Sequence, residues 1–341
     1  MNCSESEFLP MGKLDPSFLA ELINEFTIKT ESVLIGSGIG IDATVIDRGD
    51  HYLIAKTDPI TFVAEDIGYY AININANDIA CMGGIPKWFL ATLLLPENVT
   101  TKEMVRTIFR QLHAACMDKN IAFCGGHTEV SCGLDRPILI GQMLGEAAKN
   151  ALINNQQAIP GDDIILTKGI AIEAVSIIAR QKRKQLETVL SQDFVENCSN
   201  FIYKPGISVM DDAQLAAQTG GVHAMHDPTE GGLAMGLHEL SLATDCGVKV
   251  FFKEILILPE AKLLCDMYGI DPIGVIASGA LLIAADRKKS ADIIDALKRN
   301  AINARIIGKL MAREYGVKII TEEGEIDLPE FPQDEIIRIF R

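Results

Sequence analysis

The chain has 341 residues, of which 48% are hydrophobic, and its 46 acidic and 31 basic side chains give a formal net charge of −15. This hydrophobic content excludes a disordered chain and supplies core for one large domain or, as we expect, two medium-sized ones. The negative charge argues against nucleic acid as a partner, because an acidic surface repels phosphate groups. No hydrophobic run, including the one from Leu90 to Leu95, is long enough to span a membrane.

Short strands alternate with amphipathic helices along the sequence, which is the pattern of an α/β (or α+β) protein. In the first half, apolar runs predict strands over residues 51–57, 88–95, 121–124 and 137–144. The spacing of apolar residues predicts a helix over residues 66–82. The capping box Thr100–Glu103 predicts the start of a second helix, which continues to Cys116.

The polar stretch 146–157 and the turn sequence Pro160-Gly161-Asp162 predict a boundary near residue 155, between domains of residues 1–155 and 156–341. In the second domain we expect strands over 164–167, 248–252, 280–285 and 304–308. We expect helices near 171–180, 191–200, 209–218 and 230–244. The absence of a short-period repeat in the sequence excludes a solenoid or a propeller.

The sequence contains eight cysteines, and no two of them form a CxxC pair, so their spacing does not predict a zinc site. Several lie in apolar stripes, where a buried free thiol is the usual state. Because the sequence also begins without a recognisable signal peptide, we expect a protein of the reducing cytoplasm.

Acidic residues in apolar or glycine-rich surroundings are the first candidates for function. Asp42 follows a segment that includes Gly38 and Gly40, where bare backbone can approach phosphate groups closely, and a flexible turn is the alternative. Asp58 ends a predicted strand next to Thr57, and a carboxylate beside a hydroxyl suits a hard cation. An Asx turn explains Asp58 equally well, so both interpretations stay open.

Asn75 and Asp78 are three positions apart in the predicted helix 66–82 and therefore share one of its faces. A carboxylate inside an apolar helix needs a partner, because burying it unpaired costs several kcal/mol. A metal ion or an arginine would serve, and the sequence leaves both open.

Two glycine-containing segments complete the candidates. Gly125-Gly126-His127-Thr128-Glu129 follows a predicted strand, and such a loop can place an imidazole, a hydroxyl and a carboxylate around one bound group. A purely structural histidine is the alternative. The segment from His226 to Gly232 opens a predicted helix, where Asp227 or Thr229 is a candidate cap. The pair Gly231-Gly232 favours instead a helix start that faces phosphate.

Acids, glycine-rich segments and a helix start suited to anions together fit nucleotide phosphates that are held through Mg²⁺. Their order resembles the superfamily of aminoimidazole ribonucleotide synthetase, selenophosphate synthetase, thiamine-monophosphate kinase and the hydrogenase-maturation protein HypE. The HypE branch is the most similar, through its Asp-Pro-Thr-x-Gly-Gly segment and its Asn-Asp-Ile/Leu-Ala-x-Met-Gly helix. The matching segments run along nearly the whole chain and are Gly38–Ala43, Thr57–Pro59, Asn75–Pro86, Gly125–Thr128, Pro160–Asp162 and Asp227–Gly232.

The resemblance implies two α/β domains, an N-terminal domain that pairs in a homodimer, and ATP in the cleft at this pairing. It implies Asp42, Asp58 and Asp78 as Mg²⁺ ligands, with His127 or Glu129 positioning the nucleophile or moving a proton. Gly12-Lys13 is compared with a mobile N-terminal segment that closes over the nucleotide in family members. Further nucleotide or substrate contacts are implied at Gly38, Gly40, Thr57, Asn75, Gly125, Gly126, Thr128, Asp227, Gly231 and Gly232.

The chain departs from the family pattern in three places. Ile41 stands where the family loop often carries the first acid of Gly-Asp-Asp-Ala, so one metal ligand is missing. His127 stands where the kinase and many HypE proteins have Asp, and Glu129 is a candidate substitute. HypE ends in Pro-Arg-Ile-Cys, whose Cys receives a carbamoyl group, whereas Phe340 occupies this place here and Arg341 extends beyond it.

We therefore expect a HypE-like, ATP-dependent enzyme that uses Mg²⁺ and phosphoryl transfer to activate an oxygen of a small-molecule or protein-tail substrate. It lacks the terminal Cys acceptor of HypE itself. Selenophosphate synthesis is disfavoured, because Cys3 lacks the surrounding pattern of the reactive N-terminal loop. The alternatives are a small-molecule kinase resembling thiamine-monophosphate kinase and a nucleotide-binding partner protein without catalysis.

Overall fold

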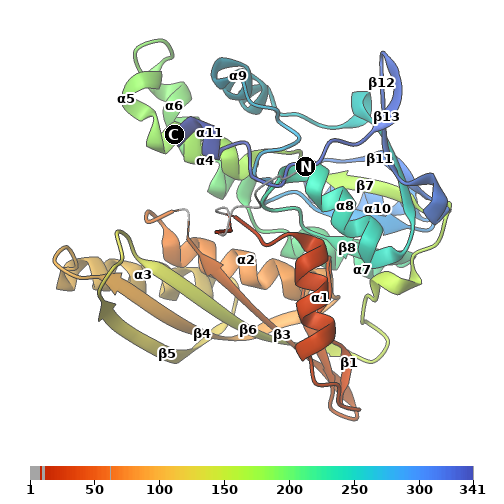
Figure 1. The fold of residues 1–341 in the computed structure, drawn as a ribbon, viewed down its shortest axis with the longest axis horizontal. Helices are drawn as coiled ribbons and strands as arrows, with labels where there is room; N and C mark the ends of the chain where they lie inside the picture. Colours follow the sequence, from red (N-terminus) through yellow and green to blue (C-terminus); the bar gives the residue numbers. More distant parts are fainter. Residues whose placement is uncertain (1–7, 10–11, 62, 341) are drawn as a thin grey trace, which may run out of the picture.

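Two separate sheets carry the strands of the computed structural model, which describes residues 8–9, 12–61 and 63–340 (Figure 1). The first sheet has the strand order β1-β2-β3-β6-β4-β5, and its neighbours are antiparallel except for the parallel pair β4–β5. Its strands are β1 (Val33–Ile35), β2 (Thr44–Asp47), β3 (His51–Ile60), β4 (Ile85–Pro96), β5 (Ala122–Ser131) and β6 (Ile138–Ala148).

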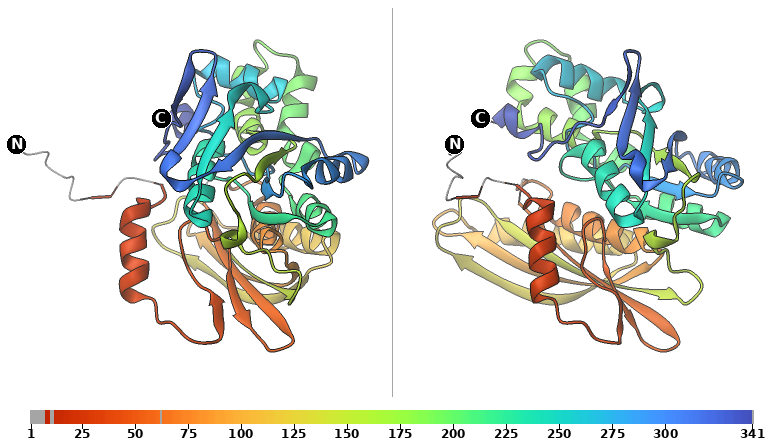
Figure 2. Two further views of the ribbon diagram at one scale, coloured as in Figure 1. Left: turned by 90° about the vertical axis from the view of Figure 1, so that its right-hand side faces the viewer. Right: turned by 45° about the vertical axis from the view of Figure 1, so that its right-hand side comes forward.

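One face of the first sheet is covered by α2 (Ile67–Cys81) and α3 (Lys102–Asp118), and α2 lies between this sheet and the second domain (Figures 1 and 2). Every residue of α2 except Tyr69 is buried. Along β4, Phe89, Ala91 and Leu93 point toward the helices and are buried, and the alternate side chains point to the opposite face. No helix of the described residues covers that opposite face. The helix α1 (Pro16–Phe26) has no buried residue.

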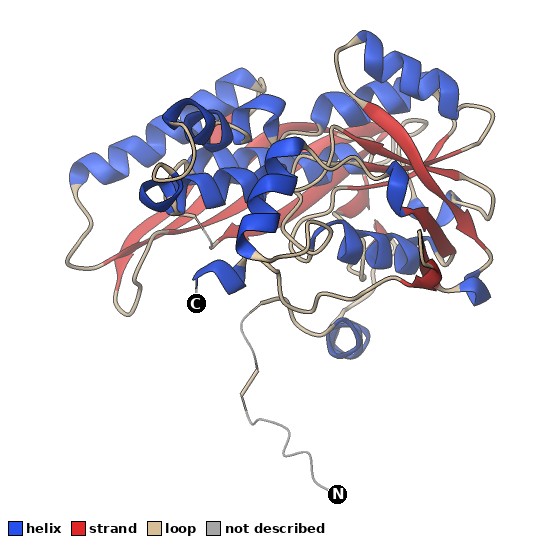
Figure 3. Cartoon of the chain, turned by 90° about the horizontal axis from the view of Figure 1, so that it is seen from above, coloured by secondary structure: helices blue, strands red, loops and turns tan. Residues whose placement is uncertain are grey.

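The second sheet has the order β13-β12-β9-β11-β7-β10-β8, with β12 and β9 as its only parallel pair among the described strands. Successive residues of β7 enter two different core clusters, because the sheet is covered on both faces, as the view from above shows (Figure 3). The strands are β7 (Asp163–Thr167), β8 (Val222–His226), β9 (Gly247–Phe251), β10 (Leu282–Ala285), β11 (Ala304–Met311), β12 (Val317–Thr321) and β13 (Gly324–Asp327).

The helices of the second domain are α4 (Ile172–Gln181), α5 (Arg183–Leu186), α6 (Gln192–Ser199), α7 (Met210–Thr219), α8 (Gly232–Thr244), α9 (Pro259–Tyr268), α10 (Ser290–Arg299) and α11 (Ile337–Phe340). Of these helices, α7, α8 and α10 contact the strands, whereas α5, α6 and α9 contact α4, and the larger of the two core clusters continues into the first domain. None of the helices in the described ranges is long and apolar enough to cross a membrane. The seven cysteines in the same ranges form no disulfide.

The expected mixed α/β fold of two domains is confirmed, and the helix predicted over 66–82 is α2. The strand predicted over 121–124 is too short, because β5 continues to Ser131, and Gly125 and Gly126 stay paired with β4 instead of forming a loop. The sequence did not predict the helices α1, α5, α9, α10 and α11 or the strands β1, β8, β12 and β13. The boundary placed near residue 155 stays a prediction, and it lies in the connection between β6 and β7.

Candidate active site between the two domains

The polar side chains of α2 face both domains. On the side of the first sheet, Asn75 donates from Nδ2 to the carbonyl oxygen of Ala71 at 2.9 Å and lies 3.5 Å from that of Asp58. Toward the second domain, Asn77 donates to the carbonyl oxygen of Ile207 at 2.9 Å and accepts from the amide of Val209 at 2.8 Å. These hydrogen bonds hold α2 in register with both domains, so its carboxylate, Asp78, has a defined place between them.

Lys56 of β3 is the cation that faces Asp78. Its Nζ lies 3.2 Å from Asp78 Oδ1 and 3.8 Å from Asp58 Oδ2. Burial by itself would lower the pKa of Lys56, but the charges of Asp78 and Asp58 raise it above its usual value. Burial raises the pKa of Asp78, and the neighbouring carboxylates add to this effect against the attraction of Lys56. One lysine therefore does not compensate for the carboxylates around it.

Asp42 lies just before β2 and meets the second domain through His226, the last residue of β8. His226 Nδ1 is 2.8 Å from Asp42 Oδ1, and its Nε2 is 2.9 Å from Glu239 Oε2 in α8. Although burial alone would lower it, the pKa of His226 is raised well above its usual value by Asp42 and Glu239. The charged imidazole and Lys13, 3.2 Å from Glu239, outweigh burial and lower the pKa of Glu239 to about 2. We conclude that His226 is an imidazolium that donates to both carboxylates.

Asp227 follows β8 and points toward the end of α2. Its Oδ1 accepts from the thiol of Cys81 at 3.5 Å, and both residues are buried. Burial, together with the charge of Asp42, raises the pKa of Asp227 to about 7. Asp227 does not cap α8, whose N-cap residue is Gly231, so the expectation of a cap at Asp227 or Thr229 is not met.

This cluster fits a divalent cation. Among the described residues, the four carboxylates of Asp42, Asp58, Asp78 and Asp227 lie against two cationic side chains, Lys56 and His226, and the charge of the more distant Lys13 also acts on Asp58. One oxygen each of Asp42, Asp78 and Asp227 is buried without a hydrogen-bond partner. Buried, unpartnered carboxylate oxygens are costly, and oxygen ligands of this kind are those that Mg²⁺ and Ca²⁺ prefer.

The backbone at Gly40 and the backbone at Gly231 each lie in close contact with another segment of the chain. Gly40 has φ of +71°, and a Cβ there would lie 2.3 Å from the carbonyl oxygen of Glu239 in α8, so only glycine fits. At the start of α8, the amide of Gly231 donates to Asp334 Oδ2 at 2.8 Å. A carboxylate of the C-terminal segment thus occupies the position at which the sequence analysis expected a phosphate.

Other predicted site residues lie away from the cluster. The hydroxyl of Thr57 donates to the carbonyl oxygen of Gly141 at 2.9 Å, and as a strand neighbour of Asp58 it points to the opposite face of the sheet. The register places Asp58 opposite Gly141, Gly141 opposite Ala91, and Ala91 opposite Gly126. Three interstrand spacings of about 4.8 Å therefore separate Asp58 from β5, or about 14 Å.

The segment Gly125–Glu129 forms part of the exposed edge strand β5. His127 Nε2 and Glu129 Oε2 are 3.0 Å apart, and Ser131 donates to Glu129 Oε1 at 2.6 Å. These hydrogen bonds lower the pKa of Glu129. Gly126 and Thr128 point to the other face of the strand, toward α3 and Phe109. Within one chain, the structure does not bring His127 and Glu129 to the carboxylates.

Sequence reasoning missed four members of the cluster: Lys56, Cys81, His226 and Glu239. Three of them lie within or beside the quoted motifs, and their proximity to an acid was the available signal. Glu239 lies inside α8, away from the glycine pair and from the other acids, so no local pattern distinguishes it.

Comparison with protein families gives a match to both domains of one family. Residues 40–147 match the AIR synthase related protein N-terminal domain, and residues 160–320 match the AIR synthase related protein C-terminal domain. The chain belongs to the AIR synthase related family. Its matched segments contain all four carboxylates of the cluster, together with Lys56, Cys81, His226 and Glu239.

Curated relatives within this family include named enzymes. A putative hydrogenase expression/formation protein of Methanocaldococcus jannaschii is 27% identical over 91% of this chain and 93% of its own length. The carbamoyl dehydratase HypE of Escherichia coli is 27% identical over 82% of this chain and 80% of its own length. A selenide, water dikinase of Shewanella baltica is 27% identical over 90% and 92%. The chain is thus related to enzymes that carry out different reactions.

Solved structures agree with the family in fold. A HypE–HypF complex superposes with a TM-score of 0.74 at 19% identity, covering 92% of this chain and 99% of the other. A HypE structure in complex with ATP has a TM-score of 0.70 at 19% identity and covers 93% and 96%. A thiamine-monophosphate kinase homologue bound to AMPPCP and TMP has a TM-score of 0.71 at 17% identity and covers 92% and 94%. At these identities the likeness concerns the fold alone.

Proposed function

We propose that this protein is an ATP-dependent enzyme that activates an oxygen of its substrate by phosphoryl transfer. The observation that carries the proposal is the cluster of four carboxylates between the domains, in which three buried oxygens have no partner. A polyanion such as ATP does not approach an acidic cluster directly, so a divalent cation must lie between them. The ATP complex of a related HypE supports the choice of nucleotide.

Asp42, Asp58 and Asp78 would hold Mg²⁺, which neutralises charge on the transferring phosphoryl group when bound. Lys56 places a permanent positive charge against Asp58 and Asp78, and His226 orients Asp42. Because Ile41 removes one acid and Lys56 adds one cation, we propose that this cluster needs fewer added cations than a family loop with two adjacent acids.

His127 and Glu129 would act from a second copy of the chain, because about 14 Å separates β5 from Asp58 within one copy. The hydrogen bond between His127 Nε2 and Glu129 leaves Nδ1 to accept a proton from a substrate hydroxyl. The uncovered face of the first sheet would carry the homodimer contact. It presents the partly exposed apolar side chains Trp88, Leu90, Leu94, Ile138, Ile140 and Leu144.

The dimer has a direct test. Leu90→Lys places a charge on the uncovered face, and we expect sedimentation to show monomers and the rate of ADP release to fall. Leu242→Lys is the matched control, because Leu242 is an exposed leucine on α8, in the other domain. A wild-type chain that sediments as a monomer under all conditions would contradict the dimer.

Calorimetric titration with ATP, with and without Mg²⁺, tests the proposal itself. We expect saturable binding only with Mg²⁺, and Asp78→Asn should weaken it by more than about tenfold, because a ligand is lost. Asp295→Asn, an exposed acid of α10, is the matched control and should bind as the wild type does. Binding of Mg²⁺-ATP that survives Asp78→Asn unchanged would refute the metal assignment.

A nucleotide-binding protein without catalysis is the second candidate, and the place of the C-terminus favours it. Phe340 stands where HypE carries its acceptor Cys, and its ring packs 5.5 Å from Nζ of Lys182, at the end of α4. Ile336 and Ile337 are buried in the core, so this tail does not reach the carboxylates. Release of ADP over many turnovers with a substrate present would exclude this candidate.

A further inference from the structure

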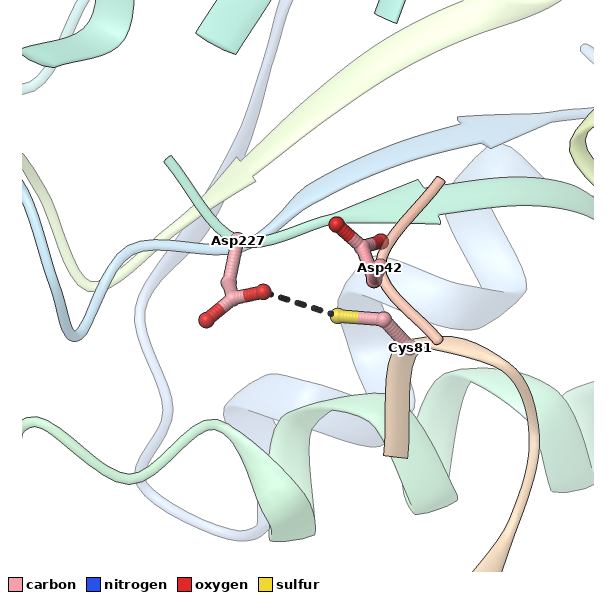
Figure 4. A group of neighbouring side chains, drawn as sticks. All are labelled: Asp42, Cys81 and Asp227. Carbon is pink, nitrogen blue, oxygen red and sulfur yellow. Dashed lines mark hydrogen bonds between the residues drawn. The ribbon is translucent and has the colours of Figure 1, made fainter. Parts of the chain in front are cut away.

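Cys81 places a sulfur atom inside a cluster that otherwise offers oxygen. It is the last residue of α2, and its Sγ lies 3.5 Å from Asp227 Oδ1. One atom each of Asp42, Cys81 and Asp227 lies within 4.8 Å of the other two, and all three residues are buried. Figure 4 shows the thiol directed toward Asp227, with the carboxylate of Asp42 beside both.

The separation of these atoms matches that of ligands around one metal ion. Zinc–sulfur and zinc–oxygen bonds of about 2.3 and 2.0 Å at a tetrahedral angle put the sulfur and oxygen about 3.5 Å apart. The distance from Cys81 Sγ to Asp227 Oδ1 is 3.5 Å. Without an ion, the same distance is a thiol-to-carboxylate hydrogen bond, and burial together with Asp227 raises the pKa of Cys81.

Two unpartnered atoms point to a missing ligand in the same place. Asp42 Oδ2 and Asp227 Oδ2 are buried without a hydrogen bond, and the two residues are 7% and 3% exposed. The other oxygen of Asp42 is already held by His226, which is itself held by Glu239. Such supporting hydrogen bonds are those that orient a carboxylate ligand toward a metal.

The chemistry of the donor set distinguishes this site from a magnesium site. Mg²⁺ prefers oxygen ligands throughout, whereas a thiolate favours softer ions such as Zn²⁺ or Co²⁺. A pair of exposed acids would not distinguish Mg²⁺ from these softer ions. A buried thiol beside two buried carboxylates favours the softer ions.

We propose that Asp42, Cys81 and Asp227 form a site for one borderline-soft divalent cation of the Zn²⁺ or Co²⁺ type. On binding, the Cys81 thiol gives its proton to the buffer, and the thiolate and the two carboxylates coordinate the ion. This site needs no nucleotide and shares Asp42 with the Mg²⁺ site of the proposed function. It gives the Cys81 thiol a role within the acidic cluster.

Titration of the metal-free full-length protein with Co²⁺, in the absence of nucleotide, tests the site. Thiolate ligation produces a sulfur-to-cobalt charge-transfer band in the near ultraviolet, and we expect one band that saturates at one ion per chain. Cys81→Ser should abolish the band and weaken Co²⁺ binding at least about 100-fold, because a ligand costs more than its supporting partners do. A wild-type protein without the band would overturn the proposal.

The controls separate this thiol from the others. The triple variant of Cys3, Cys124 and Cys132 to serine removes Cys3 and the two exposed cysteines of the described ranges and should keep the band. Loss of the band in that variant, or its survival in Cys81→Ser, would refute Cys81 as the ligand. If Cys81→Ser does not fold, Asp227→Asn keeps the thiol and should weaken Co²⁺ binding equally.

Binding of ATP distinguishes this inference from the proposed function. A protein that shows the cobalt band but binds no Mg²⁺-ATP would refute the proposed function and leave this site intact. A protein that binds Mg²⁺-ATP but shows no cobalt band would refute this inference and leave the proposed function intact.

Discussion

The imidazole of His226 lies 2.8 Å from the carboxylate of Asp42 and joins the second domain to the first. Both residues are buried, and Glu239 holds the second ring nitrogen at 2.9 Å. A cation between two carboxylates fixes the relative position of β8, α8 and the loop before β2. This contact assembles the candidate site only when the two domains are docked.

Replacing His226 by Gln should therefore destabilise the protein strongly. The substitution leaves Asp42 buried without its cation and leaves the partly buried Glu239 with Lys13 alone, which we expect to cost about 3–5 kcal/mol of unfolding free energy. Urea denaturation at pH 7 measures this loss. Lys13→Met is the matched control, because Lys13 pairs with Glu239 from a half-exposed position and should cost less than about 1 kcal/mol. Equal losses in the two variants would contradict the role of His226.

A methyl group at Gly40 should separate the glycine-rich loop from α8. The added Cβ would lie 2.3 Å from the carbonyl oxygen of Glu239, at φ of +71°. We expect Gly40→Ala to cost about 2 kcal/mol more than Gly49→Ala, whose φ is +94° but whose Cβ would contact nothing within 4 Å. Thermal or urea unfolding provides the comparison, and Mg²⁺-ATP binding should weaken only in Gly40→Ala. If both variants lose the same unfolding free energy, the close approach of Gly40 to the carbonyl oxygen of Glu239 does not contribute to stability.

Glu173 should make the stability of the protein depend on pH. This residue of α4 is buried, and burial raises its pKa to about 7, against the hydroxyl of Ser278, which lowers it. Since the folded state holds this proton more tightly than the unfolded state, the contribution of Glu173 to stability is largest below pH 4.5 and is lost as the pH rises through 7. The loss amounts to about 3 kcal/mol.

Glu173→Gln removes this titration. We expect the variant to exceed the unfolding free energy of the wild type by less than about 1 kcal/mol at pH 5 and by about 3 kcal/mol at pH 8. Urea denaturation at the two pH values measures the difference. An effect of the substitution that is the same at pH 5 and pH 8 would show that Glu173 does not titrate in this range.

The C-terminal segment should act as part of the fold. Asp334 accepts from the amides of Gly231 and Ile336, and Ile336 and Ile337 are buried. Removing residues 340–341 forfeits mainly the contact of Phe340 with Lys182 and should cost less than about 1 kcal/mol, with Mg²⁺-ATP binding unchanged.

Removing residues 336–341 instead deletes two buried isoleucines and should cost several kcal/mol. Chemical denaturation of the two truncated proteins measures both losses. A complete loss of nucleotide binding after removal of residues 340–341 alone would mean that the tail enters the active site.

Local pattern was sufficient for much of the fold. The buried helix α2 follows from its apolar spacing, and the strands around Trp88 and Ile164 follow from apolar runs, because burial on both sides selects such residues. Local pattern failed at Gly125 and Gly126, where it predicts a loop. Their pairing with β4 depends on a neighbour that is distant in sequence, and tertiary contact overrode the glycine signal.

The sequence by itself determined the family and the two-domain architecture, and it singled out the four acids Asp42, Asp58, Asp78 and Asp227 as candidates, because the motifs that carry them are contiguous segments with characteristic spacing. Only the tertiary structure decided which residues meet. It placed Cys81 and His226 beside Asp42, and it kept His127 three interstrand spacings away from Asp58. The physical reason is that these contacts join segments that are 39 residues (Asp42 and Cys81) or 184 residues (Asp42 and His226) apart, or depend on strand register, and neither leaves a mark in the local sequence.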